Sequence, residues 1–338
     1  MIRFVMGSAL VVAATGFLSA CGASANANAP VAAEARNLPP GAQFDTDANC
    51  PAPRCFDVQV PLPEGVAVTD NHVRVILPIG YGDGRKYPVL YLMHDAGGTY
   101  KIWTEQTDIL KLSRAFDAII VMPDGGHGSD AGWYSDWHDG SRQWETYHIN
   151  VMIPWIESHL DALGDGHRAI AGASMGGFGS MSYSARHPGM FAAAGGISGA
   201  VDLLYLQQLS ALGVNALNPV ISTPDASVWG SFVTNYSEWQ AHDPASNIGG
   251  MSGMQVFLAT GNGTVGGAYD DLTRPTAAGY YAVENLCWQM NNAFADALTS
   301  AGIEHHTFFY GPGYHDWPYF REEMVWLLPQ LISVIRPG

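Results

Sequence analysis

The pentapeptide Gly-Ala-Ser-Met-Gly at residues 172–176 could present a serine as a nucleophile. In this G-x-S-x-G pattern a strand turns sharply into a helix, and the small residues let the backbone pass close to itself. The pattern alone is a weak signal in a chain with 39 glycines. Its context strengthens it, because residues 168–171 predict a strand and residues 177–186 predict a helix. We therefore predict that Ser174 is a nucleophile.

A serine hydroxyl needs a general base, and the base needs a carboxylate that holds its tautomer. After such a turn, these partners follow in the chain order serine, acid, histidine. His315 is the predicted base, because it lies in the loop that follows the last predicted strand, residues 306–310. His242, His305 and His306 are the competing histidines, and the last two begin that strand at its opposite end.

The residues alone leave the acid open. Asp270 and Asp271 lie in the loop after the predicted strand 255–260, which is a usual place for it. Glu284 lies farther along, near the start of the predicted helix 279–301. Position alone favours Asp270 or Asp271.

Two backbone N–H groups should bind the oxyanion of such a reaction. One is predicted to be that of Met175, directly after the serine. The second should come from the loop after the predicted strand 89–94, where Ala96 is our predicted donor. Gly97 and Gly98 follow and allow a substrate carbonyl to come close.

Short β-rich runs alternate with helical patterns from Cys55 onward, which predicts an α/β fold with a mainly parallel sheet. The predicted strands are residues 56–60, 72–77, 89–94, 118–122, 169–171, 193–197, 255–260 and 306–310. The predicted helices are residues 104–115, 142–162, 175–187, 279–301 and 319–334. Residues 200–250 have weaker periodicity and predict a small excursion over the active site.

Composition narrows the class of protein. The 338 residues have a formal net charge of −16, which repels phosphate backbones, so we expect no nucleic-acid partner. Residues 261–266 fit G-x-G-x-x-G, but a loop follows where a dinucleotide site needs a helix. The histidines and cysteines lack the spacing of a zinc site, and we expect neither metal nor cofactor.

The N-terminus predicts export. An apolar stretch over residues 5–18 is followed by Leu-Ser-Ala-Cys, which is typical of a lipoprotein signal cut before a lipidated Cys21. The predicted organisation is a signal peptide over residues 1–20, a flexible tether over 21–50 and a catalytic domain over 51–338. The membrane is then contacted only through the lipid anchor. The competing reading is an ordinary signal peptide cut near Ala25, giving a secreted protein.

Three cysteines remain after Cys21. Cys50 and Cys55 flank a turn-like stretch and can form a disulfide in an oxidising compartment. Cys287 is then the odd one, predicted as a buried and inert thiol.

The chain also resembles a family, the putative-esterase family of α/β-hydrolases, which contains esterase D-like enzymes and the cell-wall mycolyltransferases. The resemblance is carried by residues 91–94, 122–126, 133–137, 144–146, 172–177, 229–230, 242–244, 261–264 and 315–319. It implies the α/β-hydrolase fold. It also implies that the acid is a glutamate after the Gly-Asn-Gly-Thr loop, which moves the prediction from the aspartates to Glu284.

One departure bears on the substrate. The mycolyltransferases carry Asp-Gly-Leu-Arg after the strand 89–94, whereas this chain has His-Asp-Ala-Gly-Gly at residues 94–98. The sequence therefore favours an esterase that hydrolyses small-molecule or lipid esters through an acyl-enzyme. The alternatives are an acyltransferase with a sugar or glycerol acceptor, and a catalytically silent surface protein that binds its ligand.

Overall fold

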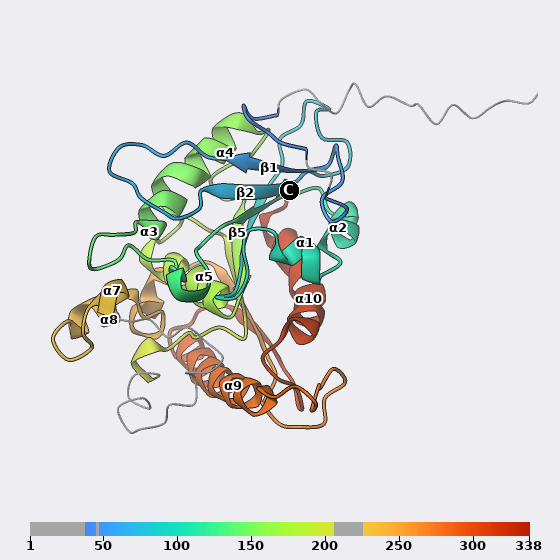
Figure 1. Ribbon diagram of the computed structural model, residues 1–338. Helices are drawn as coiled ribbons and strands as arrows, with labels where there is room; N and C mark the ends of the chain where they lie inside the picture. The colour runs from blue at the N-terminus through green and yellow to red at the C-terminus, as the bar shows by residue number, and fades with distance from the viewer. Residues whose placement is uncertain (1–37, 45–46, 206–225) are drawn as a thin grey trace, which may run out of the picture.

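The computed structural model describes residues 38–44, 47–205 and 226–338 (Figure 1). The predicted signal peptide, Cys21 and the first part of the predicted tether lie outside these residues. No helix in the described ranges is long and apolar enough to cross a membrane.

A single eight-stranded sheet forms the centre of the protein, in the order β1-β2-β4-β3-β5-β6-β7-β8. β1 pairs with β2, and β2 with β4, in antiparallel fashion, and every other neighbouring pair is parallel. The strands are β1 (Cys55–Gln59), β2 (His72–Ile76), β3 (Val89–Met93), β4 (Ile119–Pro123), β5 (Arg168–Ala173), β6 (Ala193–Ile197), β7 (Gln255–Thr260) and β8 (His305–Phe309). The predicted α/β class with a mainly parallel sheet is confirmed.

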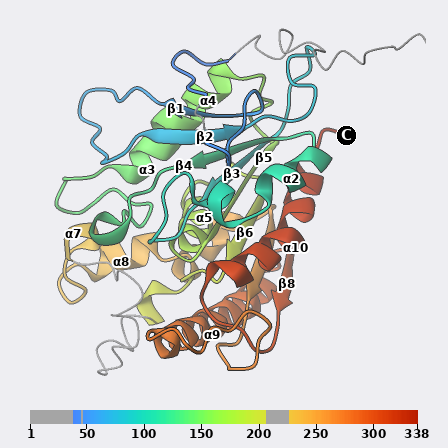
Figure 2. The ribbon, with the colours of Figure 1, turned by 45° about the vertical axis from the view of Figure 1, so that its right-hand side comes forward.

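Helices cover both faces of the sheet (Figures 1 and 2). The α-helices are α1 (Ile102–Gln106), α2 (Ile109–Leu112), α3 (Trp144–Thr146), α4 (Ile153–His159), α5 (Met175–Arg186), α7 (Ala226–Trp229), α8 (Tyr236–His242), α9 (Ala277–Ser300) and α10 (Trp317–Ile335). The other helical turns are η1 (Ser113–Ala115), η2 (Gly128–Asp130), η3 (Tyr147–Met152) and η4 (Ala245–Met251).

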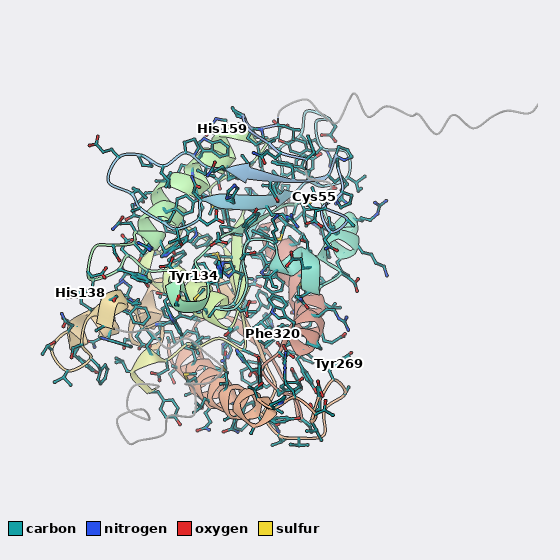
Figure 3. The ribbon with its side chains drawn as sticks, in the orientation of Figure 1. Cys55, Tyr134, His138, His159, Tyr269 and Phe320 are labelled. Carbon is teal, nitrogen blue, oxygen red and sulfur yellow. A yellow bond between two sulfur atoms is a disulfide. The ribbon has the colours of Figure 1, made fainter. Side chains whose placement is uncertain are left out.

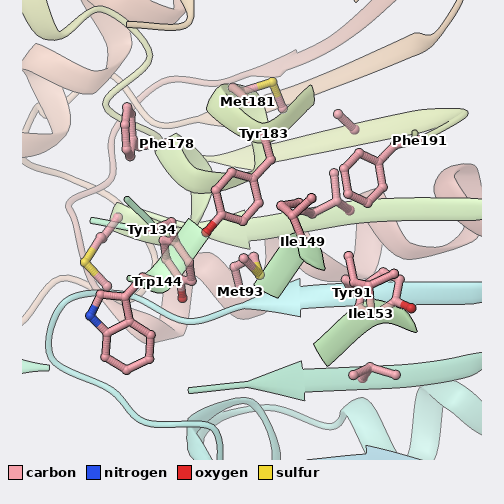
Figure 4. Close-up of a cluster of buried hydrophobic side chains, with 14 of the residues drawn as sticks. Tyr91, Met93, Tyr134, Trp144, Ile149, Ile153, Phe178, Met181, Tyr183 and Phe191 are labelled. Atoms are coloured by element: carbon pink, nitrogen blue, oxygen red, sulfur yellow. The ribbon is translucent and has the colours of Figure 1, made fainter. Parts of the chain in front are cut away.

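Alternate side chains of the buried strands enter two separate cores. Tyr91 and Met93 of β3 pack with α4, α5 and α9 on one face, and Figure 4 shows part of this cluster. Leu90 and Leu92 of the same strand pack with α1, α2 and α10 on the other face. A strand covered on both faces is apolar throughout, which explains why the continuous apolar runs marked these strands.

Two predicted helices are broken in the structure. The range 104–115 contains two short helices and a 3₁₀ turn, and the range 142–162 changes from α3 through the π-helical η3 to α4. Pro154 lies in the first turn of α4 and has no N–H to donate to the preceding turn, which disfavours a regular α-helix across this point.

The described part of the predicted tether packs against the body. Gln43 forms an antiparallel bridge with Asp57 of β1, and a disulfide joins Cys50 to Cys55. Residues Gln43 and Cys50 therefore contact the body of the protein directly.

Arg74 explains why these residues pack. Its guanidinium is completely buried in β2 and binds both carboxylate oxygens of Asp57, at 2.7 and 2.9 Å. It also lies 3.0 Å from the carboxylate of Asp47 and donates to Thr104 Oγ1 at 2.6 Å. A buried cation needs such partners. The hydrogen bond to Thr104 also holds α1, which follows the loop that contains Ala96.

The described part of residues 200–250 packs beside α5 and not over the candidate site. Trp229 of α7 contacts Phe178 of α5 with ring centroids 5.6 Å apart, and it contacts Trp133 at 6.0 Å. These rings are buried against each other, which holds α7 and α8 away from the pocket at Ser174. Residues 206–225, the middle of the predicted excursion, lie outside the described part.

Candidate active site

Ser174 occupies the turn between β5 and α5 in a strained conformation, with φ = 54°. Its N–H donates to the carbonyl of Ile197 at the end of β6, at 2.8 Å. Two glycines make the turn possible. A Cβ on Gly172 would lie 2.4 Å from the backbone of Gly176, and a Cβ on Gly176 would lie 2.5 Å from the carbonyl oxygen of Met93. The sequence therefore folds into the sharp strand–helix turn that the pentapeptide predicts.

The structure brings Ser174, His315 and Glu284 into one hydrogen-bonded chain. His315 Nε2 lies 2.8 Å from Ser174 Oγ, and its Nδ1 lies 2.8 Å from Glu284 Oε2. The three side chains are almost completely buried. Because a carboxylate only accepts hydrogen bonds, Nδ1 carries the proton and Nε2 is free to accept the serine proton. This is the geometry of a serine activated by a base.

Glu284 of α9 is 1% exposed and is held by polar groups at the ends of two strands. Its Oε1 accepts hydrogen bonds from Ser198 Oγ at 2.8 Å, Thr260 Oγ1 at 3.0 Å and the Gly261 N–H at 2.7 Å. The sequence reasoning missed these three residues. The available signal was their place, because Ser198 and Gly261 directly follow β6 and β7 and Thr260 ends β7.

The competing aspartates do not contact His315. The Asp270 carboxylate accepts hydrogen bonds from Tyr319 Oη at 2.6 Å and from the N–H groups of Gly266 and Gly267. Burial alone would raise the pKa of Asp270, but these hydrogen bonds bring it below its usual value. Asp271 is exposed and binds Thr273. Both therefore order the loop before α9.

The other histidines lie elsewhere. His242 Nδ1 contacts the carbonyl oxygen of Glu238 within α8, and His306 stacks on Phe257 of β7. His305 begins β8 and contacts the carbonyl oxygen of Ile303.

The loop after β3 lies against the start of α5. His94 is completely buried, and its Nε2 accepts the N–H of Gly125 at 2.7 Å. Its other ring nitrogen lies 2.6 Å from the carbonyl oxygen of Asp95, and its own carbonyl accepts Tyr134 Oη at 2.9 Å. These contacts fix the backbone that leads to Ala96, which lines the same pocket as Ser174.

A pocket of about 280 Å³ opens beside Ser174. Its lining is mixed, with apolar side chains next to charged ones: Asp95, Ala96, Gly97, Ile102, Ser174, Arg274, Tyr280, His315, Asp316, Trp317 and Phe320. Phe320, labelled in Figure 3, meets the His315 ring edge-on with centroids 4.9 Å apart.

Arg274 and Asp316 form a charged wall of this pocket that the sequence did not predict. Arg274 Nη1 lies 2.6 Å from Asp316 Oδ2, and its guanidinium lies 4.6 Å from the centroid of the Tyr280 ring. Asp316 is itself fixed, because it caps α10 through the N–H of Trp317. The pocket therefore offers hydrogen-bond donors and acceptors beside an apolar surface.

Asp95 adds a half-buried carboxyl group to the pocket. Its Oδ1 is shielded from solvent and has no hydrogen-bond partner in the described part of the chain, and its Oδ2 accepts only a long bond from Gly97. Burial raises the pKa of Asp95, while the imidazoles of His94 and His315 oppose this shift.

No cluster of three or more metal-ligating side chains occurs within the described ranges. Residues 261–266 lead into a loop, and the next helix, α9, begins only at Ala277. Gly263 lies against the backbone of Tyr281 in α9. This glycine-rich segment therefore packs the loop against α9 and does not open a helix.

Comparisons with known proteins agree with this geometry. A family model described as Putative esterase matches residues 67–331. An esterase of Mycobacterium tuberculosis is 34% identical over 276 residues, covering 79% of this chain and 56% of that protein. The diacylglycerol acyltransferase/mycolyltransferase Ag85B of Mycobacterium intracellulare is 26% identical over 268 residues, covering 75% of this chain and 77% of that protein. This chain thus spans about half the length of the first relative.

A solved structure shows the same fold. The S-formylglutathione hydrolase from Agrobacterium tumefaciens aligns with a TM-score of 0.62 and 15% identity, over 83% of this chain and 95% of that one. The likeness shows the α/β-hydrolase fold that the sequence resemblance implied.

The turn at Ser174 can be tested by adding one methyl group. Gly176→Ala places a Cβ 2.5 Å from the carbonyl oxygen of Met93, which is backbone and cannot move aside. We expect the free energy of unfolding to fall by about 1–3 kcal/mol, measured by urea denaturation. Gly249→Ala is the matched control, because a Cβ there meets nothing within 4 Å. Equal stability of the two variants would contradict the observed packing.

Proposed function

The chain belongs to the Putative esterase family, and from this we propose that it is a serine esterase with Ser174 as nucleophile, His315 as general base and Glu284 as acid. One observation supports the assignment above all others. The hydrogen bonds run without a break from Ser174 Oγ through the His315 ring to Glu284. Failure of any one contact would leave a serine hydroxyl that is a poor nucleophile.

The proposed reaction has two halves. Ser174 Oγ attacks the ester carbonyl carbon while His315 Nε2 takes its proton, and the N–H groups of Met175 and Ala96 bind the oxyanion. Met175 suits this role because it is the first residue of α5, and first-turn N–H groups have no acceptor within the helix. His315 then protonates the leaving alcohol. Water, activated by the same imidazole, releases the acid from the acyl-enzyme. These steps need no cofactor.

The pocket supports a small ester as substrate. Its volume of about 280 Å³ lies just below the usual range for ligand pockets, which begins at about 300 Å³. Ile102, Trp317 and Phe320 offer an apolar surface, and Arg274 with Asp316 offers polar groups. We infer a small-molecule ester with both an apolar and a polar part.

Replacing Ser174 tests whether the protein is an esterase with this residue as its nucleophile. We expect Ser174→Ala to lower kcat for p-nitrophenyl butyrate by at least about 10³-fold without unfolding the protein. A fluorophosphonate probe should label the wild type and not this variant. Ser252→Ala, at an exposed serine, is the control and should be labelled like the wild type. A wild type that resists the probe would favour the silent binding protein instead.

An acyltransferase is the second candidate, because an acyl-enzyme can pass its acyl group to an alcohol as well as to water. The likeness to the diacylglycerol acyltransferase/mycolyltransferase Ag85B favours this candidate. The loop at residues 94–98 has no arginine, which favours hydrolysis.

Competition between acceptors separates the two. With p-nitrophenyl butyrate and added trehalose or glycerol, we expect free butyrate to be the main product, measured by mass spectrometry. The rate of nitrophenol release serves as the control for total turnover. Acylated sugar or acylated glycerol as the main product would assign the protein to the transferases.

We also propose that the protein is exported and held at the outer face of the membrane by lipid on Cys21. The support is the Leu-Ser-Ala-Cys sequence after the apolar stretch 5–18.

Labelling with radioactive palmitate tests the anchor. The wild type, produced in a bacterial host, should incorporate label and enter the detergent phase, and Cys21→Ser should do neither. Cys287→Ser is the control, because this thiol is buried and free. A mature N-terminus directly after Ala25 would point to an ordinary signal peptide and a secreted protein.

A further inference from the structure

A second carboxyl group, that of Glu323, is buried close to the proposed active site. Its side chain in α10 is 0% exposed. Tyr310 Oη donates to its Oε1 at 2.8 Å, and Oε2 has no hydrogen-bond partner in the described ranges. A buried carboxylate with one donor is costly, because it loses its hydration without replacement.

Glu323 is connected to Glu284 through two contacts. The Tyr310 ring packs on Gly261, where a Cβ would lie 3.1 Å from the ring. The Gly261 N–H in turn donates to Glu284 Oε1 at 2.7 Å. The side chain of Glu323 therefore fixes the ring against which an anchor of Glu284 is packed.

The titratable groups around Glu323 come from three elements. α9 contributes Glu284 and the Cys287 thiol, whose pKa is raised by burial and by the charge of Glu284. Tyr310 follows β8, and Tyr319 of α10 itself stacks on Tyr310 with centroids 6.2 Å apart. The nearby charge is that of Glu284, and it repels a second negative charge.

When two carboxyl groups are neighbours, ionising both costs free energy because the two negative charges repel each other. The group with fewer hydrogen-bond donors therefore holds the proton. Glu284 has hydrogen bonds with Ser198, Thr260, Gly261 and His315, whereas Glu323 has one with Tyr310 and no other within the described residues. We propose that Glu323 is a positioning residue that stays protonated in the folded protein and so keeps the negative charge of this region on Glu284. The functional part of this inference rests on the proposed esterase mechanism.

The direction of the pKa shift agrees with this assignment. Burial raises the pKa of Glu323 well above its usual value, the charge of Glu284 raises it further, and the hydrogen bond from Tyr310 opposes both. A carboxyl group whose pKa is raised by folding costs no stability below its unfolded pKa of about 4.3. Above that pH the folded protein must hold a proton that the unfolded chain has lost, so its stability falls as the pH rises.

Glu323→Gln replaces the titratable carboxyl group with an uncharged amide and keeps the shape of the side chain. We expect the difference in Tm between this variant and the wild type to grow from pH 4.5 to pH 7.5 in favour of the variant. Glu322→Gln is the matched control on the same helix, because Glu322 is exposed and should give a difference that hardly changes with pH. A difference for Glu323→Gln that is independent of pH, or that favours the wild type as the pH rises, overturns the proposal.

The pH profile of kcat/KM tests the functional part. The acid limb reports the pKa of the catalytic imidazole, which a nearby negative charge raises. Glu323→Gln should therefore leave this limb within about 0.3 pH units of the wild type, because no charge is lost. A shift of one unit toward lower pH would show that Glu323 is ionised and overturn the inference.

Glu323→Leu tests positioning. It leaves Tyr310 without its acceptor, and we expect kcat to fall about threefold to tenfold with KM unchanged, whereas Glu323→Gln keeps kcat. Equal kcat for Gln and Leu overturns the positioning role. If the Gln variant does not fold, the Leu variant carries the same pH test of stability. If the wild type has no esterase activity, the proposed function fails while the stability experiment still decides the protonation.

Discussion

The site depends on one constraint, which is that the carboxylate of Glu284 is buried. A charge in this position is tolerated only if most of its oxygen lone pairs accept hydrogen bonds. The donors come from the ends of β6 and β7 and from the loop after β8. Three neighbouring strands must therefore end at the same level, and the parallel order of the sheet ensures that they do. The sheet thus positions the hydrogen-bond donors that stabilise the Glu284 carboxylate.

Backbone strain occurs at this same edge of the sheet. Ser174 and Ser198 directly follow neighbouring strands, and both have positive φ, 54° and 45°. Non-glycine residues adopt this region at a cost, which must be offset by their surroundings. Ser174 donates its N–H to Ile197, and Ser198 donates its N–H to Ala259. Each strained residue is thus tied to the next strand, and the strain is offset by bonds that also align the serine hydroxyls.

The sequence predicted the central strands well because β3, β4, β5, β6 and β7 are buried on both faces and lack charged residues in their interior. The structure shifts the ends of the eight predicted strands by no more than two residues. Ser174 and His315 follow from motif and position. Glu284 did not follow from position, which favoured Asp270 and Asp271. The reason is geometric, since α9 folds back over the ends of β6 and β7 and brings a distant residue to them. Only the family resemblance carried that information.

The charged pair that lines the pocket, Arg274 and Asp316, comes from residues outside the loop after β3. That loop lacks the arginine of the mycolyltransferases, and from this the sequence favoured an esterase. In the folded chain Arg274, from the loop before α9, reaches the same pocket and pairs with Asp316 beside His315. Arg274 therefore supplies the pocket with a guanidinium from a position different from that of the mycolyltransferase arginine. Because the two loops are far apart in sequence and meet only through the sheet, substrate preference must be argued from the assembled pocket.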